Sequence, residues 1–407
     1  MRSFLKQHLA GIVGQVAAAL PLLLVTVTIA RLETLADAGR FTVVVGLSAA
    51  AFSTALWGLR TSILLDRFRE FSPADYARTR AASIVLATTI TAAGAAWMRL
   101  DWWILLAIVL LRASDALVDL LMASLQVLAG TGRALGWFAG LHLAKLTLVT
   151  FALVVGLFIE RDFTYPLICV AGFVSLGGAA QVVRRRVFLP TQVRESVGLA
   201  RIWRIIVRAR WYAAAAVMCS VLTSAPRVIV AKLYEGDLMG VAGVSLSLST
   251  FFGMVYFTIW ARNLPRFEST RGGPRVVGLY LIEWVGVGLA LGIVSWFVLP
   301  PMAGWIFMFQ GAEQQELSRS VLFSGVVFAA GMTLANLYKV TSTPWREVLT
   351  YVLPFPVAGM ALLFAPWTRN IPSLLWIAGS TMSVSAIPAI VLLVRTHGRP
   401  NERDGSE

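Results

Sequence analysis

Residues 29–50 read IARLETLADAGRFTVVVGLSAA, a short charged turn between two long apolar segments. A second copy of this design lies near the middle of the chain. Aligning Ile29–Leu32 (IARL) with Val230–Leu233 (VAKL) also aligns Gly39 with Gly240 and Ser48 with Ser249. The chain therefore contains an internal repeat, which is typical of transporters with a substrate site between the two copies.

The apolar character of these segments extends over the whole chain of 407 residues. It is 58% hydrophobic and only 14% charged, with a mean hydropathy of +0.76. In an average soluble protein, charged residues alone make up about a quarter of the chain. Apolar runs of about 20 residues, the length a helix needs to cross a bilayer core, recur from Leu9 to Leu393. The composition predicts an all-α polytopic membrane protein.

Apolar windows between Gly, Pro and charged residues predict twelve transmembrane helices. Their expected ranges are 8–30, 41–59, 81–98, 102–128, 135–158, 165–183, 211–233, 239–261, 276–299, 318–338, 347–366 and 372–394. Most of the 35 lysines and arginines then lie on the same side as the N-terminus. The positive-inside rule places both termini in the cytoplasm. The net charge of +14 thus reflects topology, and no nucleic-acid partner is expected.

A basic segment divides the chain at its midpoint. Between Arg184 and Arg210, apolar residues alternate with arginines at helical spacing. This pattern is typical of an amphipathic helix on the inner leaflet, and a solvated basic loop is the alternative. The predicted organisation is a six-helix lobe (1–190), a cytoplasmic amphipathic linker (191–210), a second six-helix lobe (211–396) and a cytoplasmic tail (397–407).

The repeated stretches resemble the polysaccharide flippases of the multidrug/oligosaccharidyl-lipid/polysaccharide (MOP) superfamily, whose fold is MATE-like. The resemblance rests on residues 29–50, on Trp57–Arg60 and on Pro226–Phe267, with Gly39, Gly240 and Pro265 at the positions where the family has Gly, Gly and Pro. Asp37 and Ala38 stand where the family more often has a bulkier acidic or aromatic pair. This difference from the family bears on the identity of the substrate and not on the fold.

The resemblance implies two lobes around a central cavity that opens alternately to each side. The implied cargo is an undecaprenyl-diphosphate-linked oligosaccharide, moved outward across the bacterial inner (cytoplasmic) membrane for lipopolysaccharide or exopolysaccharide biosynthesis. The implied partners are this lipid-linked oligosaccharide, membrane lipids, and a polysaccharide polymerase with its glycosyltransferases.

Three charged residues share one face of the fourth predicted span. Arg112, Asp115 and Asp119 are spaced i, i+3 and i+7. A charge near the bilayer centre costs about 3 kcal/mol, so such a face calls for an explanation. In one hypothesis Arg112 binds a diphosphate and an aspartate couples transport to an ion or proton. In the other, Arg112 neutralises Asp115 and a neighbouring helix neutralises Asp119.

Cations on two other spans are candidates for the same anionic substrate. Lys145, one turn from His142 in the fifth span, either pairs with Asp119 or contacts the substrate. Arg227 follows Pro226, which removes a backbone hydrogen bond from the seventh span. The planar fork of an arginine suits phosphate oxygens, so Arg227 is the leading candidate for the diphosphate site.

Three further charged residues complete the set of candidates. Glu283, in the ninth span, either couples transport to an ion or neutralises the charge of Arg112 or Arg227. Arg31 and Lys232 are repeat-equivalent residues at the outer ends of the first and seventh spans. They either anchor these helices at the interface or bind substrate at the outward mouth.

No soluble catalytic motif is present, because the sequence has no P-loop, no H-E-x-x-H and no nucleophile elbow. The protein is therefore predicted not to be an enzyme, and a membrane ligase or glycosyltransferase is the alternative. Cys169 and Cys219 both fall within apolar spans, so no metal or other cofactor is expected. The nearest rival is a cation-coupled drug or metabolite antiporter of the same fold, because fold does not decide cargo.

Overall fold

A computed structural model describes residues 2–56, 59–66, 70–159, 161–188, 203–205, 207, 210–268, 273–309, 311–340, 344–364 and 370–396. Within these ranges the secondary structure is helical and contains no strand, which confirms the predicted all-α class. The chain forms two compact units, Met1–Val244 (unit 1) and Ser245–Glu407 (unit 2).

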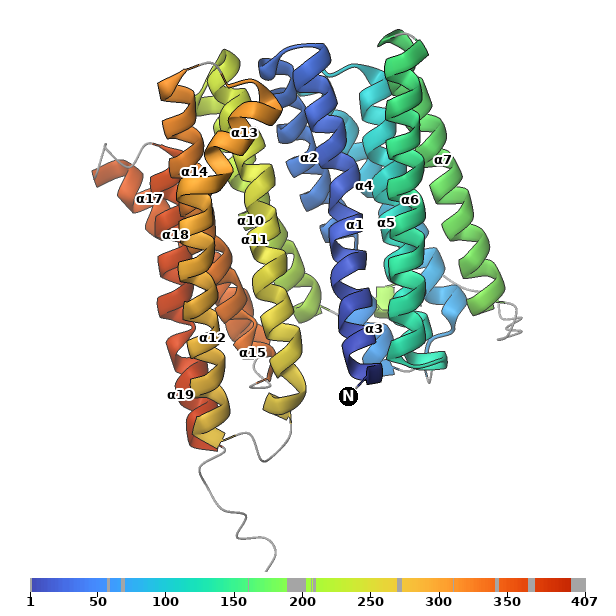
Figure 1. Ribbon diagram of the computed structural model, residues 1–407. Helices are drawn as coiled ribbons and strands as arrows, with labels where there is room; N and C mark the ends of the chain where they lie inside the picture. Colours follow the sequence, from blue (N-terminus) through green and yellow to red (C-terminus); the bar gives the residue numbers. More distant parts are fainter. Residues whose placement is uncertain are drawn as a thin grey trace, which may run out of the picture. The chain divides into compact units, whose positions relative to one another are not determined.

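In its described residues, unit 1 is built mainly from long helices, with three short helical segments among them (Figure 1). They are α1 (Arg2–Leu32), α2 (Leu35–Leu56), α3 (Leu59–Asp66), α4 (Pro73–Trp97), α5 (Trp102–Leu128), α6 (Thr131–Ile159), η1 (Arg161–Phe163), α7 (Thr164–Val183), η2 (Arg184–Phe188) and α10 (Arg210–Leu233). Helix α11 (Gly236–Glu268) begins in unit 1 and continues into unit 2. Helix α1 packs along α6, α5 along α7, and α2 against both α4 and α10.

Local sequence signals set the ends of the helices that hold the charged residues. Ser72 forms a capping box with Asp75, and Pro73 occupies the first turn of α4. Asp101 caps α5 by accepting a hydrogen bond from the backbone N–H of Trp103. Gly130 adopts a φ of 85° between α5 and α6, a conformation that glycine reaches without strain. The chain reverses there, so α5 and α6 pack as an antiparallel pair.

Unit 2 contains the second part of α11 and a set of helices of very different lengths (Figure 1). They are α12 (Gly273–Ile293), η3 (Val294–Val298), α13 (Leu299–Phe307), α14 (Ala312–Ala335), α15 (Leu337–Val340), α16 (Pro344–Val352), α17 (Pro354–Phe364), α18 (Ile371–Ser385) and α19 (Ile387–Thr396). Helices α14 and α18 meet backbone to backbone. A Cβ on Gly331 would lie only 2.3 Å from the carbonyl oxygen of Gly379, so glycine permits this contact.

Ten of the predicted spans are confirmed as helices long and apolar enough to cross a membrane. The other two correspond to α4 and α5, which have 25 and 27 residues. Helix α4 is rich in alanine and threonine, and α5 contains the three charges of Arg112, Asp115 and Asp119. Length and composition of the described residues therefore establish a multi-pass membrane protein, without confirming the total of twelve.

Two predicted segments lie largely outside the described residues. Of the linker 191–210, the structure describes only Trp203–Ile205, Val207 and Arg210, and the tail 397–407 lies outside entirely. The amphipathic linker and the division into lobes at that linker therefore stay predictions.

The internal repeat has a direct structural counterpart. Gly39 and Gly240, which the repeat sets over each other, lie in contact: a Cβ on Gly39 would be 2.7 Å from the amide nitrogen of Gly240. A Cβ on Gly240 would be 2.0 Å from the carbonyl oxygen of Leu35. The backbones of α2 and of the first turns of α11 thus come into direct contact at these two glycines. Contact between equivalent residues is what a two-fold relation between copies produces.

Candidate functional site

Charged side chains gather in the interior of unit 1, on α4, α5, α6 and α10. Helix α5 is central because its predicted charged face exists: Arg112, Asp115 and Asp119 are all only partly exposed. Each aspartate has a cationic partner on a different neighbouring helix. The face therefore ties three helices together, and within α5 Asp115 also attracts Arg112.

Asp115 is bound by Lys145 of α6. The Lys145 ammonium donates a hydrogen bond to Oδ1 of Asp115, and the lysine side chain is only 2% exposed. His142 Nδ1 lies 3.4 Å from the same oxygen, and its ring packs edge-on against Phe138. Lys145 is the middle residue of α6, so this ion pair lies far from both helix ends.

The expected pairing of Lys145 with Asp119 is wrong, because the α5–α6 reversal fixes a different register. The two helices are antiparallel about Gly130, so residues equally far from the turn face each other. Asp115 and Lys145 are about equally far from it, whereas Asp119 is a full turn closer.

Asp119 is instead bound by Arg80 of α4, a residue absent from the predicted site. Arg80 Nη2 donates to Asp119 Oδ2 at 2.9 Å, and the arginine side chain is completely buried. Arg60 of α3, which is 39% exposed, lies 3.9 Å from the other oxygen of Asp119. The prediction that a neighbouring helix neutralises Asp119 is confirmed.

Arg227 of α10 lies buried against α2. Its Nη1 donates to the carbonyl oxygen of Thr223 at 3.3 Å, one turn earlier in the same helix. The rest of the side chain fills space that Gly46 of α2 leaves open, since a Cβ there would lie 2.6 Å from Cδ of Arg227. Arg112 and Arg227 are close enough to repel each other electrostatically. Three of the five predicted cationic ligands, Arg112, Lys145 and Arg227, thus share one region, because Asp115 interacts with both Lys145 and Arg112.

The cluster has more positive than negative charge. Among the described residues, the cations Arg60, Arg80, Arg112 and Lys145 interact with two carboxylates, Asp115 and Asp119. Arg227 lies within electrostatic reach of Arg112. Nε and Nη1 of Arg80 and Nε of Arg112 are buried with no hydrogen-bond partner among the described residues. Buried donors of this kind are costly, and an anion with several oxygen atoms would satisfy them.

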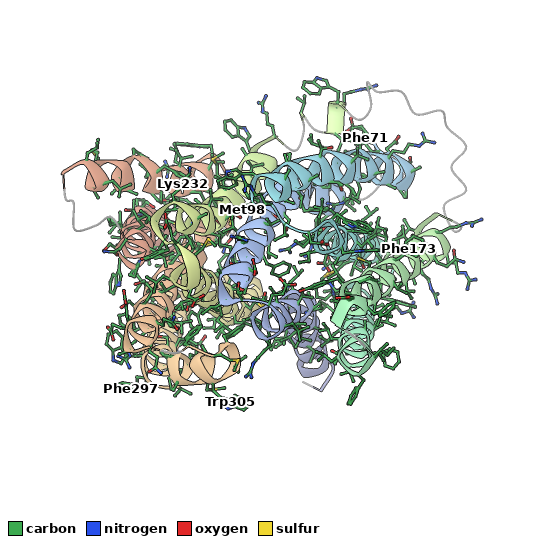
Figure 2. All side chains as sticks on the ribbon, turned by 90° about the horizontal axis from the view of Figure 1, so that it is seen from above. Phe71, Met98, Phe173, Lys232, Phe297 and Trp305 are labelled. Atoms are coloured by element: carbon green, nitrogen blue, oxygen red, sulfur yellow. The ribbon has the colours of Figure 1, made fainter. Side chains whose placement is uncertain are left out.

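The remaining predicted site residues lie elsewhere. Arg31 is exposed in the last turn of α1, and Lys232 lies over the Trp97 ring at 5.9 Å, in the region of Met98 (Figure 2). Glu283 belongs to unit 2, where Asn263 Nδ2 donates to it at 3.1 Å. Its expected link to Arg112 or Arg227 stays a prediction. The described residues contain no group of three His, Cys, Asp or Glu side chains that could hold a metal ion.

Comparison with known proteins identifies the fold. No protein-family model and no curated protein sequence matches the chain. Solved structures do match over almost its whole length. The MATE multidrug transporter DinF-BH, in a ligand complex, is 12% identical and covers 97% of this chain and 95% of its own, with a TM-score of 0.67. The Vibrio cholerae MATE transporter VcmN in its bent form is also 12% identical, with a TM-score of 0.55 over 97% and 96% of the two chains.

A third similar structure is a MOP superfamily transporter from Pyrococcus furiosus. It is 13% identical and covers 98% of this chain and 96% of its own, with a TM-score of 0.60. That protein is described as having a binding pocket of reverse polarity, which suggests a different function for it. These similarities confirm the predicted MATE-like fold, and the matching proteins are transporters rather than enzymes. They do not identify a cargo.

Proposed function

From this MATE fold, we propose that the protein is an alternating-access flippase of the bacterial cytoplasmic membrane. Its cargo is an undecaprenyl-diphosphate-linked oligosaccharide destined for a surface polysaccharide. The expected partners are the lipid-linked substrate, membrane lipids, and the polymerase and glycosyltransferases that act before and after transport. Both termini face the cytoplasm in this proposal.

The observation that supports this cargo is the excess of buried cations on α4, α5, α6 and α10. Cations buried in a membrane span are expensive, so a protein that keeps several of them close together can use them to bind an anionic substrate. A diphosphate supplies two adjacent anionic groups with several oxygens, which suit the forked donors of Arg112 and Arg227. A site for organic cations favours an excess of carboxylates instead.

The ion pairs divide the predicted residues into different roles. Lys145 is held by Asp115, and Arg80 is held by Asp119. Arg112 has a buried Nε with no hydrogen-bond partner among the described residues, and Arg227 is buried against Gly46 within electrostatic reach of it, so we assign the diphosphate to these two first and to Lys145 second. Asp115, Asp119 and Glu283 are the candidates for ion coupling, because protonation of either aspartate would release a cation for substrate. Arg31 and Lys232 remain candidates for the mouth of the cavity.

The experiment is a deletion of the gene in its host, followed by complementation with wild type, Arg227→Ala and Arg227→Lys. We expect the deletion to remove surface glycan and to leave lipid-linked oligosaccharide accumulating on the cytoplasmic side. Wild type restores the glycan, Arg227→Ala does not, and Arg227→Lys restores it only partly, because an ammonium lacks the bidentate fork.

A matched control is Arg40→Ala, which removes an exposed arginine paired with Asp37 at 3.0 Å. It is expected to complement as well as wild type. Normal surface glycan in the deletion strain, in a background without a second flippase, would refute the proposed cargo.

The competing function is a cation-coupled drug or metabolite antiporter. It is favoured by the similarity to DinF-BH, a multidrug transporter. The same deletion strain distinguishes the two, because an antiporter predicts increased sensitivity to toxic organic cations with unchanged surface glycan.

A further inference from the structure

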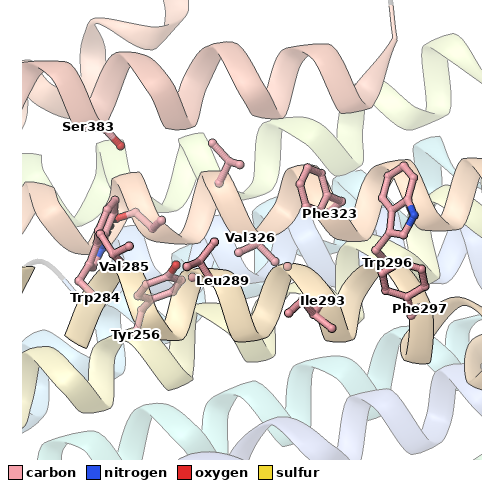
Figure 3. Close-up of a pocket in the computed structure, with 14 residues that line it drawn as sticks. Tyr256, Trp284, Val285, Leu289, Ile293, Trp296, Phe297, Phe323, Val326 and Ser383 are labelled. Atoms are coloured by element: carbon pink, nitrogen blue, oxygen red, sulfur yellow. Dashed lines mark hydrogen bonds between the residues drawn. The ribbon is translucent and has the colours of Figure 1, made fainter. Parts of the chain in front are cut away.

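Unit 2 contains an apolar groove of about 440 Å³ that the proposed transport reaction does not use. It is bordered by α11, α12, η3, α14 and α18, and Figure 3 shows its side chains along α12 and η3 facing those of α14. Aromatic rings form its walls, chiefly Trp284, Trp296 and Phe323. Ser383 contributes a polar side chain at one border.

Two glycines create the groove. Gly288 and Gly292 lie one turn apart on α12, and both belong to its lining. A Cβ on Gly292 would lie 3.4 Å from Cε2 of Phe323, so a larger side chain at this position would extend into the groove. The π-helical segment η3 follows directly and holds Trp296 and Phe297. Such segments inside α-helices occur frequently at functional sites.

The rim of the groove is exposed and apolar. Leu289, Ile293 and Phe297 are 66%, 60% and 69% exposed. They lie within Pro274–Phe307, a segment long and apolar enough to cross a membrane. Phe297 and Trp305 lie at the outer edge of unit 2 in Figure 2. An apolar rim in a membrane span is covered by hydrocarbon chains, so the groove is accessible to lipid.

A cation marks one end of the groove. The Arg319 guanidinium lies over the Trp296 ring at 5.5 Å, and its Nε donates to the Trp296 carbonyl oxygen at 3.3 Å. Its Nη1 donates to Glu316 at 2.6 Å. These contacts hold the guanidinium beside the groove and leave Nη2 for a further acceptor. The side chain is one-third exposed, as a headgroup ligand requires.

The length of the groove fits one leaflet. From Trp284 to Trp296 the helix rises about 18 Å at 1.5 Å per residue, while half a bilayer core is about 15 Å. We propose that this groove binds one acyl chain of an anionic phospholipid, whose headgroup is held by Arg319. An undecaprenyl chain is longer than a leaflet and fits less well. This inference is independent of the proposed cargo.

The test uses the full-length protein in phosphatidylcholine vesicles that contain a lipid brominated in mid-chain, which quenches nearby tryptophans. The quenching at Trp296 is the difference between wild type and Trp296→Phe. We expect brominated phosphatidylglycerol to compete for the groove about fivefold better than brominated phosphatidylcholine, the preference that one basic residue near a membrane surface provides. Arg319→Gln abolishes the preference, and Arg319→Lys retains most of it.

Matched glycine variants separate occupancy from folding. Gly292→Leu fills the groove and should remove the Trp296 quenching by both lipids. Gly286→Leu adds the same bulk to α12 where no atom lies within 4 Å of the new Cβ, and should leave the quenching unchanged. Equal quenching by both headgroups, or quenching that survives Gly292→Leu in a protein that elutes as wild type does, overturns the proposal. So does displacement of phosphatidylglycerol by a trace of undecaprenyl phosphate, which would assign the groove to the substrate.

Discussion

The contact between Lys145 and Asp115 places two opposite charges together at the middle of α6. Removing one partner of a fully buried pair costs about 3 to 5 kcal/mol. Asp115 is 25% exposed, and without Lys145 it would still have His142 Nδ1 3.4 Å from its Oδ1. We therefore expect Lys145→Met to lower the free energy of unfolding, by less than this full amount. The measurement is unfolding of the purified protein in a mixed-detergent titration.

The double variant Lys145→Met with Asp115→Asn is the control for this pair. It removes both charges, so it should be clearly more stable than Lys145→Met alone. If the two single effects simply add, the ion pair is not what stabilises this part of unit 1.

Gly46 provides a second prediction, because it makes room for the side chain of Arg227. In Gly46→Ala the new methyl group would overlap Cδ of Arg227 and displace the guanidinium. A misplacement of about 1 Å can cost a hundredfold in activity, so we expect at least a tenfold loss of transport. Gly136→Ala, on α6 with no atom near its Cβ, is the matched control. Transport in complemented cells checks both, and equal activity of the two variants would contradict the placement of Arg227.

The sequence located most of these residues without revealing their partners. Helical spacing alone shows that Arg112, Asp115 and Asp119 share a face. Which cation meets which aspartate depends on the register between helices, and Gly130 was the available signal for it. Arg80 was missed because the third span was expected to start after it. The capping box of Ser72 and Asp75 shows that this helix begins a full two turns earlier.

Among the elements, α2 and α11 approach each other closely at Gly39 and Gly240. Side chains larger than hydrogen would force these helices apart, and overpacking typically costs about 1 to 3 kcal/mol. Gly240→Leu is therefore expected to destabilise the protein by at least that much. Thermal unfolding in detergent measures it, with Gly136→Leu as the control in open space. Comparable stability of the two variants would mean that this helix contact is not required.

The helices themselves were well predicted, since apolar runs of membrane length leave little choice of structure. Their boundaries were predicted less accurately. Helix α11, for example, extends to Glu268, although its predicted span ends at 261. Hydropathy marks the part of a helix in hydrocarbon, whereas capping and packing set its ends. Hydropathy also does not predict the close contacts between glycines, because these contacts depend on how the helices pack in the folded protein.

For the whole molecule, the distribution of arginines predicts cytoplasmic termini. A green fluorescent protein fused after Thr396 should fluoresce, and alkaline phosphatase fused after Phe163 should be active on the outer side. Exchanging the two reporters should silence both. The opposite pattern would invert the topology and place the wrong ends of the helices at the cytoplasm.

The polar face of α5 has a consequence for how the protein is made. Three charges entering the bilayer on a single helix would cost about 9 kcal/mol on insertion scales. Arg80 and Lys145, which neutralise two of these charges, reside on the helices synthesised immediately before and after α5. Helix α5 is therefore expected to wait at the translocon until α6 has emerged from the ribosome. A chain truncated after Leu128 should then fail to integrate its last helix, although the same helix is stable in the finished protein.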